Sequence, residues 1–596
     1  DGPYTQILID SRPVFSALSG VYGLEQIPAS MIERVEVMRG GGSALFGSSA
    51  IAGTINIITK EPLRNSGQLS HTLTALGGGS SFDNNTSLNA SLVTDDHRAG
   101  LYIFGQNRHR SGYDYDGDGF TELPKLKNQT VGFRSYLKTS TYSKLTFEYH
   151  HMQEFRRGGD MLDRPPHEAH IAEQLQHSID GGSLKFDYFS PDEKNRLSIF
   201  ASAANTDRDS YYGPGNDPLK AYGKTTDLTA MGGAQYVHTF DKCFFMPSDL
   251  TAGLEYNRDR LKDNMWGYDR HTDQTVNIYS AFLQNEWKND RWGILIGGRL
   301  DKHNMVDNVI FSPRANLRFN PTQNINLRLS YSSGFRAPQA FDEDMHIENV
   351  GGTVAMIERA KNLKEEKSQS FSASADMYHR FGVFQTNFLI EGFYTRLTDV
   401  FVLGEPYDRG DGILVKTRSN GPGAKVMGLT LEGKVAYLSI LQIQAGLTLQ
   451  RSRYDEPHKW HDDAPAEKKI FRTPDTYGYF TATYTPIKPL SIALSGTYTG
   501  RMLVQRMDIT AENAELGAMP ERKAEAIRTP RFFDLGVKLA YDFKLCKTVD
   551  LQLNGGVQNL FESYQKDFDR GANRDSGYIY GPSLPRSFFA GVKISY

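Results

Sequence analysis

Cysteine is nearly absent from this sequence, which has only Cys243 and Cys546 among 596 residues. Two thiols can form at most one disulfide bond, and they can do so only in an oxidising compartment. A disulfide network therefore cannot be what holds a chain of this length together, and we expect neither cysteine to have a structural role.

Long apolar runs are also absent. No stretch approaches the roughly 20 consecutive apolar residues that a membrane-spanning helix requires, and the mean hydropathy is −0.49. These features exclude a helical membrane protein. The first residues, DGPYTQILID, lack the basic segment, apolar core and small-residue cleavage site of a signal peptide. We therefore expect any encoded leader to lie outside this sequence.

Neither charge sign dominates, because 67 Lys and Arg residues are nearly balanced by 70 Asp and Glu residues, which leaves a net charge of −3. Without a basic face or an acidic tail, the charge pattern indicates no nucleic-acid partner. The sequence also shows no Ser-His-Asp order, no paired carboxylates in a pocket context and no closed zinc motif. We therefore expect that the protein is not an enzyme.

A glycine-rich stretch near the N-terminus almost matches a phosphate-binding loop. Residues 42–49 read GSALFGSS, and glycines at this spacing would let backbone N–H groups approach a nucleotide. However, Ser48 stands where such a loop requires lysine, and the β-like run INII follows where the motif needs a helix. The stretch therefore predicts a tight strand-turn-strand unit and no nucleotide site.

From about residue 66 onward, apolar and polar residues alternate. In INLRLSYSS, the residues Ile325, Leu327, Leu329 and Tyr331 share one face, while polar residues occupy the other. The stretch LSIALSGTY and the closing segment that ends at Tyr596 repeat the pattern. A period of two residues is typical of a β-strand with one apolar and one hydrated face.

The connections between these stretches are of two kinds. Some are short, such as YTPIKPL, and others are long, polar and rich in Gly, Asp, Tyr and Pro, such as residues 205–227 and 453–480. Short turns at one end and long loops at the other are typical of a transmembrane β-barrel. About 530 residues, at about 24 for each strand and connection, predict an all-β barrel of about 22 antiparallel strands, which is wide enough to need a plug.

Residues 27–62, IPASMIERVEVMRGGGSALFGSSAIAGTINIITKEP, closely resemble the plug domain of TonB-dependent outer-membrane receptors. Gly41 stands where that family usually has proline. The terminal Tyr596 is similar to the aromatic residue that the barrel-assembly machinery reads. Three further stretches are similar to barrel motifs of the same family: GFRAPQAF (Gly334 to Phe341), KNLKEEKS (Lys361 to Ser368) and GVQNLFE (Gly556 to Glu562).

This resemblance implies an outer-membrane protein of a Gram-negative bacterium. Residues 66–596 would form the barrel, and residues 1–65 would be the C-terminal part of a small α/β plug in its lumen, with the N-terminal part of the plug and its TonB box missing from this sequence. The family's activity implies uphill uptake of a scarce, bulky nutrient, powered by the inner-membrane TonB-ExbB-ExbD complex. Outer-membrane lipid would surround one barrel per receptor.

An acidic stretch, DYDGDGFTELPK, places Asp114, Asp116 and Asp118 at positions 1, 3 and 5 of a calcium-loop pattern, with Glu122 at position 9. Lys125 at position 12 excludes a full EF-hand. In the cobalamin receptors of the resembled family, an acidic hairpin early in the barrel binds calcium and orders the substrate loops. We therefore consider a Ca²⁺ site here, with a solvated acidic loop as the equal alternative.

Histidines are candidate ligands, because a haem receptor needs an axial ligand that faces the lumen. By the same resemblance, His346 lies where haem receptors place such a ligand, but the surrounding FDEDMHIENVGG is acidic and lacks their usual haem pattern. His167, His170 and His177 lie in a loop-like region, and the first two could bind a metal if their spacing fell on a helix. Exposed loop histidines are the more common outcome.

Aromatic side chains offer flat apolar faces to a macrocycle or a catecholate, so they are candidates for direct substrate contact. The apical loop of the plug, RPVFSALSGVYG, contributes Phe15 and Tyr22. The second set lies in expected extracellular loops and comprises Tyr211, Tyr212, Trp266 and Tyr268.

Three function classes remain at this point. The first is a TonB-coupled receptor for a metal-bearing small molecule that contains cobalt or iron, either a corrinoid or a ferric siderophore or haem. The second is an importer of oligosaccharide or peptide that works with a surface lipoprotein. The third is a passive porin. A porin would not carry the plug motif, and glycan importers are usually much longer, so the first class is favoured.

Overall fold

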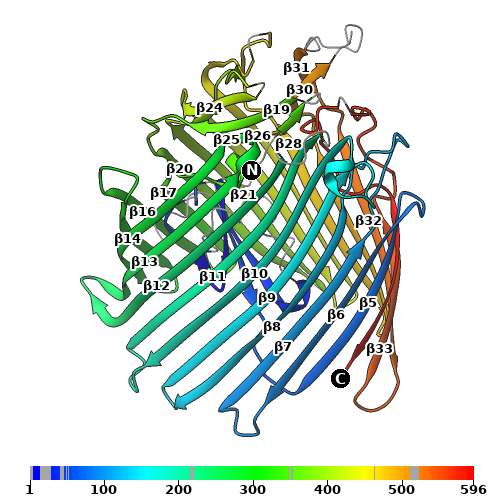
Figure 1. The fold of residues 1–596 in the computed structure, drawn as a ribbon. Helices are drawn as coiled ribbons and strands as arrows, with labels where there is room; N and C mark the ends of the chain where they lie inside the picture. Colours follow the sequence, from blue (N-terminus) through cyan, green and yellow to red (C-terminus); the bar gives the residue numbers. More distant parts are fainter. Residues whose placement is uncertain are drawn as a thin grey trace.

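The computed structural model describes residues 4–13, 28–39, 46–48, 50–51, 53–214, 221–345, 348–350, 353–411, 413–461, 463–509, 522–572 and 574–596. It shows tilted strands that close around a small N-terminal sheet (Figure 1). Among these residues, no helix has both the length and the apolar character to cross a membrane.

The barrel consists of 22 antiparallel strands, as the sequence predicts. They are β5 (Ser66–Leu76), β6 (Ser81–Val93), β7 (Ala99–Arg110), β8 (Lys125–Ser140), β9 (Ser143–Gly159), β10 (Ile171–Phe189), β11 (Asn195–Pro214), β12 (Tyr222–Cys243), β13 (Met246–Met265), β14 (Arg270–Lys288), β15 (Trp292–His303), β16 (Ile310–Thr322), β17 (Ile325–Arg336), β20 (Glu366–Phe381), β21 (Phe384–Thr398), β25 (Ala424–Tyr437), β26 (Leu441–His458), β28 (Thr476–Ile487), β29 (Leu490–Thr499), β32 (Phe532–Lys544), β33 (Asp550–Gln558) and β34 (Ser587–Ser595).

The barrel closes where its last strand meets its first. β34 pairs with β5 in antiparallel register, with Ser587 opposite Leu76. The backbone N–H of Tyr596 donates to the Gly67 carbonyl at 2.8 Å, and the Gly67 N–H donates back at 3.1 Å. Closure leaves the wall without a free edge, so every strand has a partner on both sides.

The N-terminal sheet contains β1 (Thr5–Ile9), β2 (Arg12–Pro13), β3 (Ile32–Arg39) and β4 (Gly53–Thr59), with the short η2 (Ala29–Met31) before β3. Its strand order is β2-β1-β4-β3, and only β1 and β4 are parallel. Val35 lies opposite Ile57 in the antiparallel β3–β4 pair. This pairing confirms the two strands of the strand-turn-strand interpretation, while residues 40–45, 49 and 52 of their connection lie outside the described residues, so the tight turn stays a prediction.

The long connections gather at one end of the barrel, which is the upper end in Figure 1, while tight turns close the other end. The connections carry their own short elements: η3 (Pro166–Glu168), η4 (Trp266–Tyr268), α4 (Asp342–Met345), β18 (Glu348–Val350), β19 (Thr353–Arg359), β22 (Phe401–Leu403), β23 (Tyr407–Asp408), β24 (Leu414–Asn420), β27 (Glu467–Lys469), β30 (Leu503–Ile509) and β31 (Arg522–Arg528). We call this end extracellular, because in the outer-membrane barrels of bacteria the short turns face the periplasm.

The alternation of side chains divides each strand into an outer and an inner face. Large apolar side chains cover the outside, where Leu254 is 66% exposed, Leu283 57% and Leu329 56%. Charged and hydroxyl side chains face inward and are buried, as in Asp259 and Asp301. An exposed apolar belt around a polar interior is stable only if hydrocarbon surrounds it, so the strands cross a bilayer.

The sequence-based boundaries of two loops are wrong. Residues 205–227 were expected to be a connection, but β11 extends to Pro214 and β12 begins at Tyr222. Residues 453–480 likewise contain the end of β26, β27 and the start of β28. Polar residues continue these strands, because an inward or extramembrane position does not require an apolar side chain.

Candidate substrate passage and extracellular loops

Ion pairs join the N-terminal sheet to the inner wall. Arg134 of β8 contacts the Asp10 carboxylate at 2.9 Å and Glu61 at 3.2 Å. The Tyr4 hydroxyl donates to Glu366 of β20 at 2.9 Å. Because these contacts lie on two different parts of the wall, they hold the sheet inside the lumen in one orientation.

A second contact between plug and wall lies at Gly47. Arg299 is only 1% exposed and binds Asp301 at 2.9 Å and Glu255 at 2.7 Å. Gly47 has φ +78°, and a Cβ at that position would lie 3.3 Å from the Arg299 guanidinium. Glycine therefore fits here for two reasons, since it adopts the left-handed backbone without strain and lets the plug approach the arginine closely.

Polar side chains line the lumen in a row across five neighbouring strands. Glu154, His177, Arg208, Thr225 and Asp263 lie opposite one another in register from β9 to β13. Arg208 donates to the Thr225 hydroxyl at 3.3 Å, and that hydroxyl donates to Asp263 at 2.7 Å. The row is buried, so its charges depend on these partners for stability.

Residues of the extracellular connections cover this row. Arg270 binds Asp263 at 2.9 Å and also donates to the Met345 carbonyl at 2.9 Å, which ties α4 to the wall. Arg418 of β24 pairs with Asp344 at 2.9 Å. The short sheet of β18, β19, β22, β23 and β24 is thereby fastened to α4, next to the mouth of the lumen.

The four aromatic residues of the second candidate set do not share one environment. Tyr211, Tyr212 and Tyr268 are 0%, 3% and 4% exposed and pack in one cluster with Met265. The Tyr268 hydroxyl donates to the Tyr212 carbonyl at 2.9 Å. Trp266 is 61% exposed. The three tyrosines are therefore packing residues in this conformation, and only the indole presents a free face.

The other aromatic candidates, Phe15 and Tyr22, and the histidine candidate His346 lie outside the described residues. Their roles as substrate contacts stay predictions.

The three remaining histidines do not come together. His167 contacts the Tyr222 hydroxyl at 2.9 Å, and His170 contacts Asp160 at 2.6 Å. His177 lies on β10, faces the lumen and is 4% exposed. The helix on which the first two would share a face is absent from residues 160–177, so the shared metal site considered for them is not formed there.

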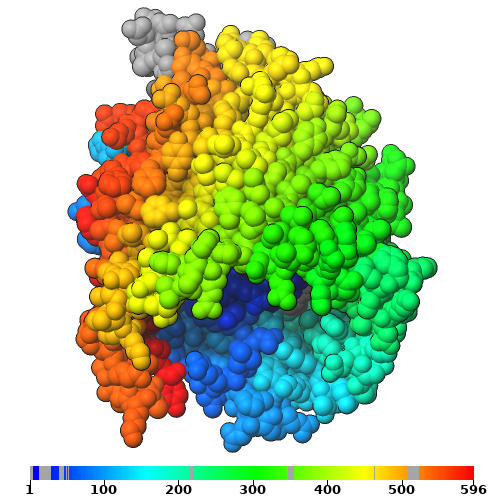
Figure 2. All heavy atoms as spheres, turned by 180° about the vertical axis from the view of Figure 1, so that it is seen from behind, coloured from blue at the N-terminus to red at the C-terminus, as the bar shows by residue number. Residues whose placement is uncertain are grey.

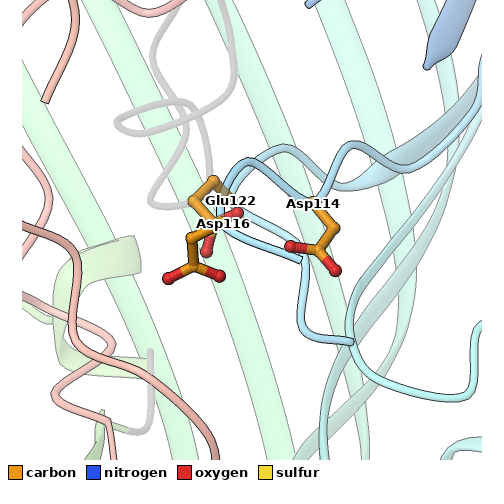
Figure 3. A group of neighbouring side chains, drawn as sticks. All are labelled: Asp114, Asp116 and Glu122. Carbon is orange, nitrogen blue, oxygen red and sulfur yellow. The ribbon is translucent and has the colours of Figure 1, made fainter. Parts of the chain in front are cut away.

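Three of the four candidate calcium ligands converge. Asp114, Asp116 and Glu122 each offer one carboxylate oxygen, and these three oxygens lie within 4.8 Å of one another. Figure 3 shows the three side chains as neighbours on the hairpin. The Asp114 carboxylate also accepts the N–H groups of Gly117 and Gly119 at 2.7 and 2.8 Å. The hairpin backbone thus fixes one of the three oxygen donors.

The fourth candidate, Asp118, turns to a different partner. It pairs with Arg574 at 2.6 Å, and the same guanidinium reaches Glu122 at 3.1 Å and lies over the Phe120 ring at 4.9 Å. Arg570 pairs with Asp116 at 3.1 Å. The hairpin between β7 and β8 is therefore fastened to the connection between β33 and β34.

The pKa values of the hairpin carboxyls reflect these contacts. Burial raises the pKa of Glu122, in spite of the Tyr115 N–H and the Arg574 charge. Burial and then the charge of Asp118 raise the pKa of Asp116. Burial also acts to raise the pKa of Asp118, but hydrogen bonds from Gly571 and Phe120 and the charge of Arg574 bring it below its ordinary value.

Sequence reasoning missed Arg570 and Arg574. Both lie in a stretch of mixed charge, FDRGANRDSG, which shows no sign of its partners. Asp118 and Arg574 are 456 positions apart, and they meet only because closure of the barrel places β34 near β7.

Two family models match the chain. The model described as TonB dependent receptor-like, beta-barrel, matches residues 59–560, and the TonB-dependent Receptor Plug Domain matches residues 1–54.

Two curated relatives carry more specific names. The chain is 25% identical over 351 residues to the Vitamin B12 transporter BtuB of Vibrio vulnificus, covering 56% of this chain and 52% of that protein. It is 26% identical over 355 residues to the Iron-regulated outer membrane virulence protein of Vibrio cholerae, covering 56% and 50%. The chain thus spans about half the length of the curated relatives it matches.

Solved structures show the same architecture. The ferric enterobactin receptor PfeA of Pseudomonas aeruginosa has a TM-score of 0.78 at 18% identity, covering 100% of this chain and 92% of that chain. The siderophore receptor PirA of Acinetobacter baumannii has a TM-score of 0.77 at 17% identity, covering 100% and 91%. At these identities the likeness concerns the fold alone. Because the barrel model covers most of the sequence, the chain belongs to the TonB-dependent outer-membrane receptors, with a plug and a 22-stranded barrel.

Proposed function

We propose that this protein imports a scarce, bulky, metal-bearing nutrient across the outer membrane, either a cobalamin-type corrinoid or a ferric siderophore or haem. The observation that carries the proposal is the sheet held in the lumen by the contacts of Arg134 with Asp10 and of Tyr4 with Glu366. Paired charges that are shielded from water resist separation strongly. Displacing the plug therefore requires work, which the TonB-ExbB-ExbD complex would supply.

The substrate class is supported by the names of the relatives. The curated proteins include a vitamin B12 transporter and an iron-regulated protein, and the solved structures include siderophore receptors. These names do not favour the oligosaccharide or peptide alternative. The exposed Trp266 at the extracellular end offers one apolar face for such a ligand.

Binding and uptake measurements test this proposal. Purified receptor should bind one member of a set that contains cyanocobalamin, haem and a panel of ferric catecholates. Cells that lack the TonB complex should keep binding and lose uptake. In planar bilayers the intact protein should show no large steady conductance, and an ohmic, porin-like current would contradict the receptor function.

A variant of the plug contact sharpens the conductance test. Arg134→Gln removes the guanidinium that binds Asp10 and is only 13% exposed, so it should raise the frequency of transient pore openings. Lys144→Gln is the matched control, because Lys144 binds the partly exposed Glu61 at 3.0 Å from a more exposed position. Equal conductance in both variants would show that the Arg134 contact does not keep the lumen closed.

We further propose that Asp114, Asp116 and Glu122 hold a Ca²⁺ ion that orders the extracellular loops. Carboxylate oxygens are the ligands that calcium prefers, and their convergence within 4.8 Å supports the proposal. Arg574 shares Glu122, so the ion must compete with a guanidinium. Ordering the hairpin before the substrate arrives would remove an entropic cost and tighten binding.

Substrate titrations in calcium and in chelator test the cation site. Wild-type affinity should be higher in calcium, and Asp114→Asn/Asp116→Asn should abolish the difference. The control is Asp95→Asn/Asp96→Asn, which makes the same change in charge at an exposed periplasmic turn. If calcium has no effect on wild type, the hairpin is only a solvated acidic loop.

A further inference from the structure

A row of cations crosses the outer wall near its extracellular end. Arg396, Lys425, Arg453 and Lys469 lie opposite one another in register on β21, β25, β26 and β27. Neighbouring strands are about 4.8 Å apart, and like charges directly opposite destabilise a sheet. Four neighbouring cations are therefore stable in this position only if nearby negative charge reduces their mutual repulsion.

The protein supplies only part of that negative charge. Asp455 pairs with Lys425 at 2.7 Å and reaches Arg396 at 3.8 Å, and Asp475 pairs with Lys469 at 2.7 Å. Within the described part of the chain, Arg453 has no anionic partner. The same holds for Arg451, which also points outward from β26.

An apolar groove lies directly below these cations on the same wall. Its volume is about 1180 Å³, and its floor contains the small residues Ala315, Ala373 and Gly392. Tyr331 and Phe371, whose rings are 4.9 Å apart, line the groove, and Phe371 lies opposite Tyr394, two positions before Arg396 on β21. A second hollow of about 670 Å³ contains both Tyr331 and Arg396, so it connects the groove to the charges.

The arrangement matches the layers of a membrane leaflet. Aromatic side chains of outer-membrane barrels concentrate at the interface between hydrocarbon and headgroups. Cations one position above the aromatics therefore lie at headgroup depth, and the groove lies at acyl-chain depth. The wall of β16 to β28 faces the reader as the green and yellow surface in Figure 2.

We propose that this wall binds one lipid with a phosphate-bearing headgroup from the outer leaflet. Its phosphates lie against Arg451, Arg453 and the neighbouring Arg396 and Lys425, and an acyl chain lies in the groove over Gly392. Guanidinium groups form strong bidentate hydrogen bonds with phosphate. The phosphate would offset the repulsion within the cation row, and the groove would exclude lipids that lack a suitable chain.

Native mass spectrometry of the detergent-purified receptor tests the lipid site, with bis-phosphorylated lipid A as the probe. Arg451→Gln/Arg453→Gln should weaken binding about thirty-fold, because each cation near a phosphate contributes a factor of about five and the two factors multiply. The control is Lys488→Gln/Lys547→Gln, which makes the same charge change in exposed periplasmic turns and should leave binding unchanged.

The groove is tested separately by Gly392→Phe, since a Cβ at Gly392 would meet no atom within 4 Å. The added ring should fill the groove and weaken binding without preventing assembly. Gly433→Phe is the control, because Gly433 has the same open space and also faces outward, opposite Phe388.

Three results would overturn the proposal. Dephosphorylated lipid A could bind as well as the phosphorylated form, which would make the contact a general apolar one. Inorganic phosphate could displace the lipid completely at millimolar concentration, which would leave no role for the groove. Lastly, each variant could bind lipid as well as its control does.

Discussion

Arg574→Ala tests whether buried charge fastens the first long extracellular hairpin to the last connection. The guanidinium is 13% exposed, and its partners Asp118 and Glu122 are 9% and 1% exposed. Removing one partner of a buried pair leaves uncompensated charge and costs about 3 to 5 kcal/mol. We expect the lower end of this range, because the hairpin can open to water while the barrel stays folded.

Hydrogen exchange of residues 111–124 and 559–586 measures this local opening. A loss of about 3 kcal/mol corresponds to exchange at least about a hundred-fold faster. Arg570→Ala is the control, because Arg570 is 62% exposed in its pair with Asp116, and exposed pairs contribute about 0 to 1 kcal/mol. If the two variants show equal exchange, burial of the Arg574 pair does not stabilise the hairpin.

Three further outcomes follow from the structure. Gly47→Ala should destabilise the plug by about 1 to 2 kcal/mol, because a Cβ strains the left-handed backbone. Hydrogen exchange of the β4 backbone amides measures this loss of stability, and an unchanged exchange rate would contradict the role given to Gly47. Tyr596→Asp should reduce the heat-modifiable barrel seen on gels, since it places a charge at the seam of the wall, and normal surface levels would refute this. The lowered pKa of Asp118 means that its contribution to stability is complete above its ordinary value of 3.8 and is lost as the pH falls through the lower folded value. The distance between spin labels on the two connections should therefore be narrowly distributed at about pH 6 and more broadly distributed at about pH 3, and an unchanged distribution would oppose the assignment.

Much of the fold could be predicted because the bilayer imposes a simple pattern. A strand such as β17 must present Leu327 and Leu329 to hydrocarbon and polar residues to the lumen, so its sequence alternates. The number of strands then follows from length. Strand ends could not be predicted, because beyond the bilayer the pattern no longer applies, as at Pro214 and Tyr222.

The candidate site was less predictable, because its contacts depend on closure of the barrel. The convergence of Asp114, Asp116 and Glu122 followed from local spacing within one hairpin. The pairing of Asp118 with Arg574 could not be predicted from local spacing, because Arg574 lies near the other end of the chain. Tyr211 offered the same aromatic signal as Trp266, and only packing distinguishes the buried ring from the exposed one.

The contact between hairpin and last connection has an aromatic part as well as an ionic part. Tyr115 meets Tyr564 and Phe568 edge to face, with ring centroids 5.2 and 5.6 Å apart. Each such pair contributes about 0.5 to 1.5 kcal/mol beyond area burial, so together they approach the ionic contribution. The turn between β5 and β6 also contacts the hairpin, because Gly77 has no side chain and so leaves room for the Tyr113 ring. Loss of Arg574 should consequently leave the two connections in contact but more mobile, because the aromatic contacts remain. In the wild-type receptor, where both kinds of contact are present, a ligand that moves one connection must also move the other.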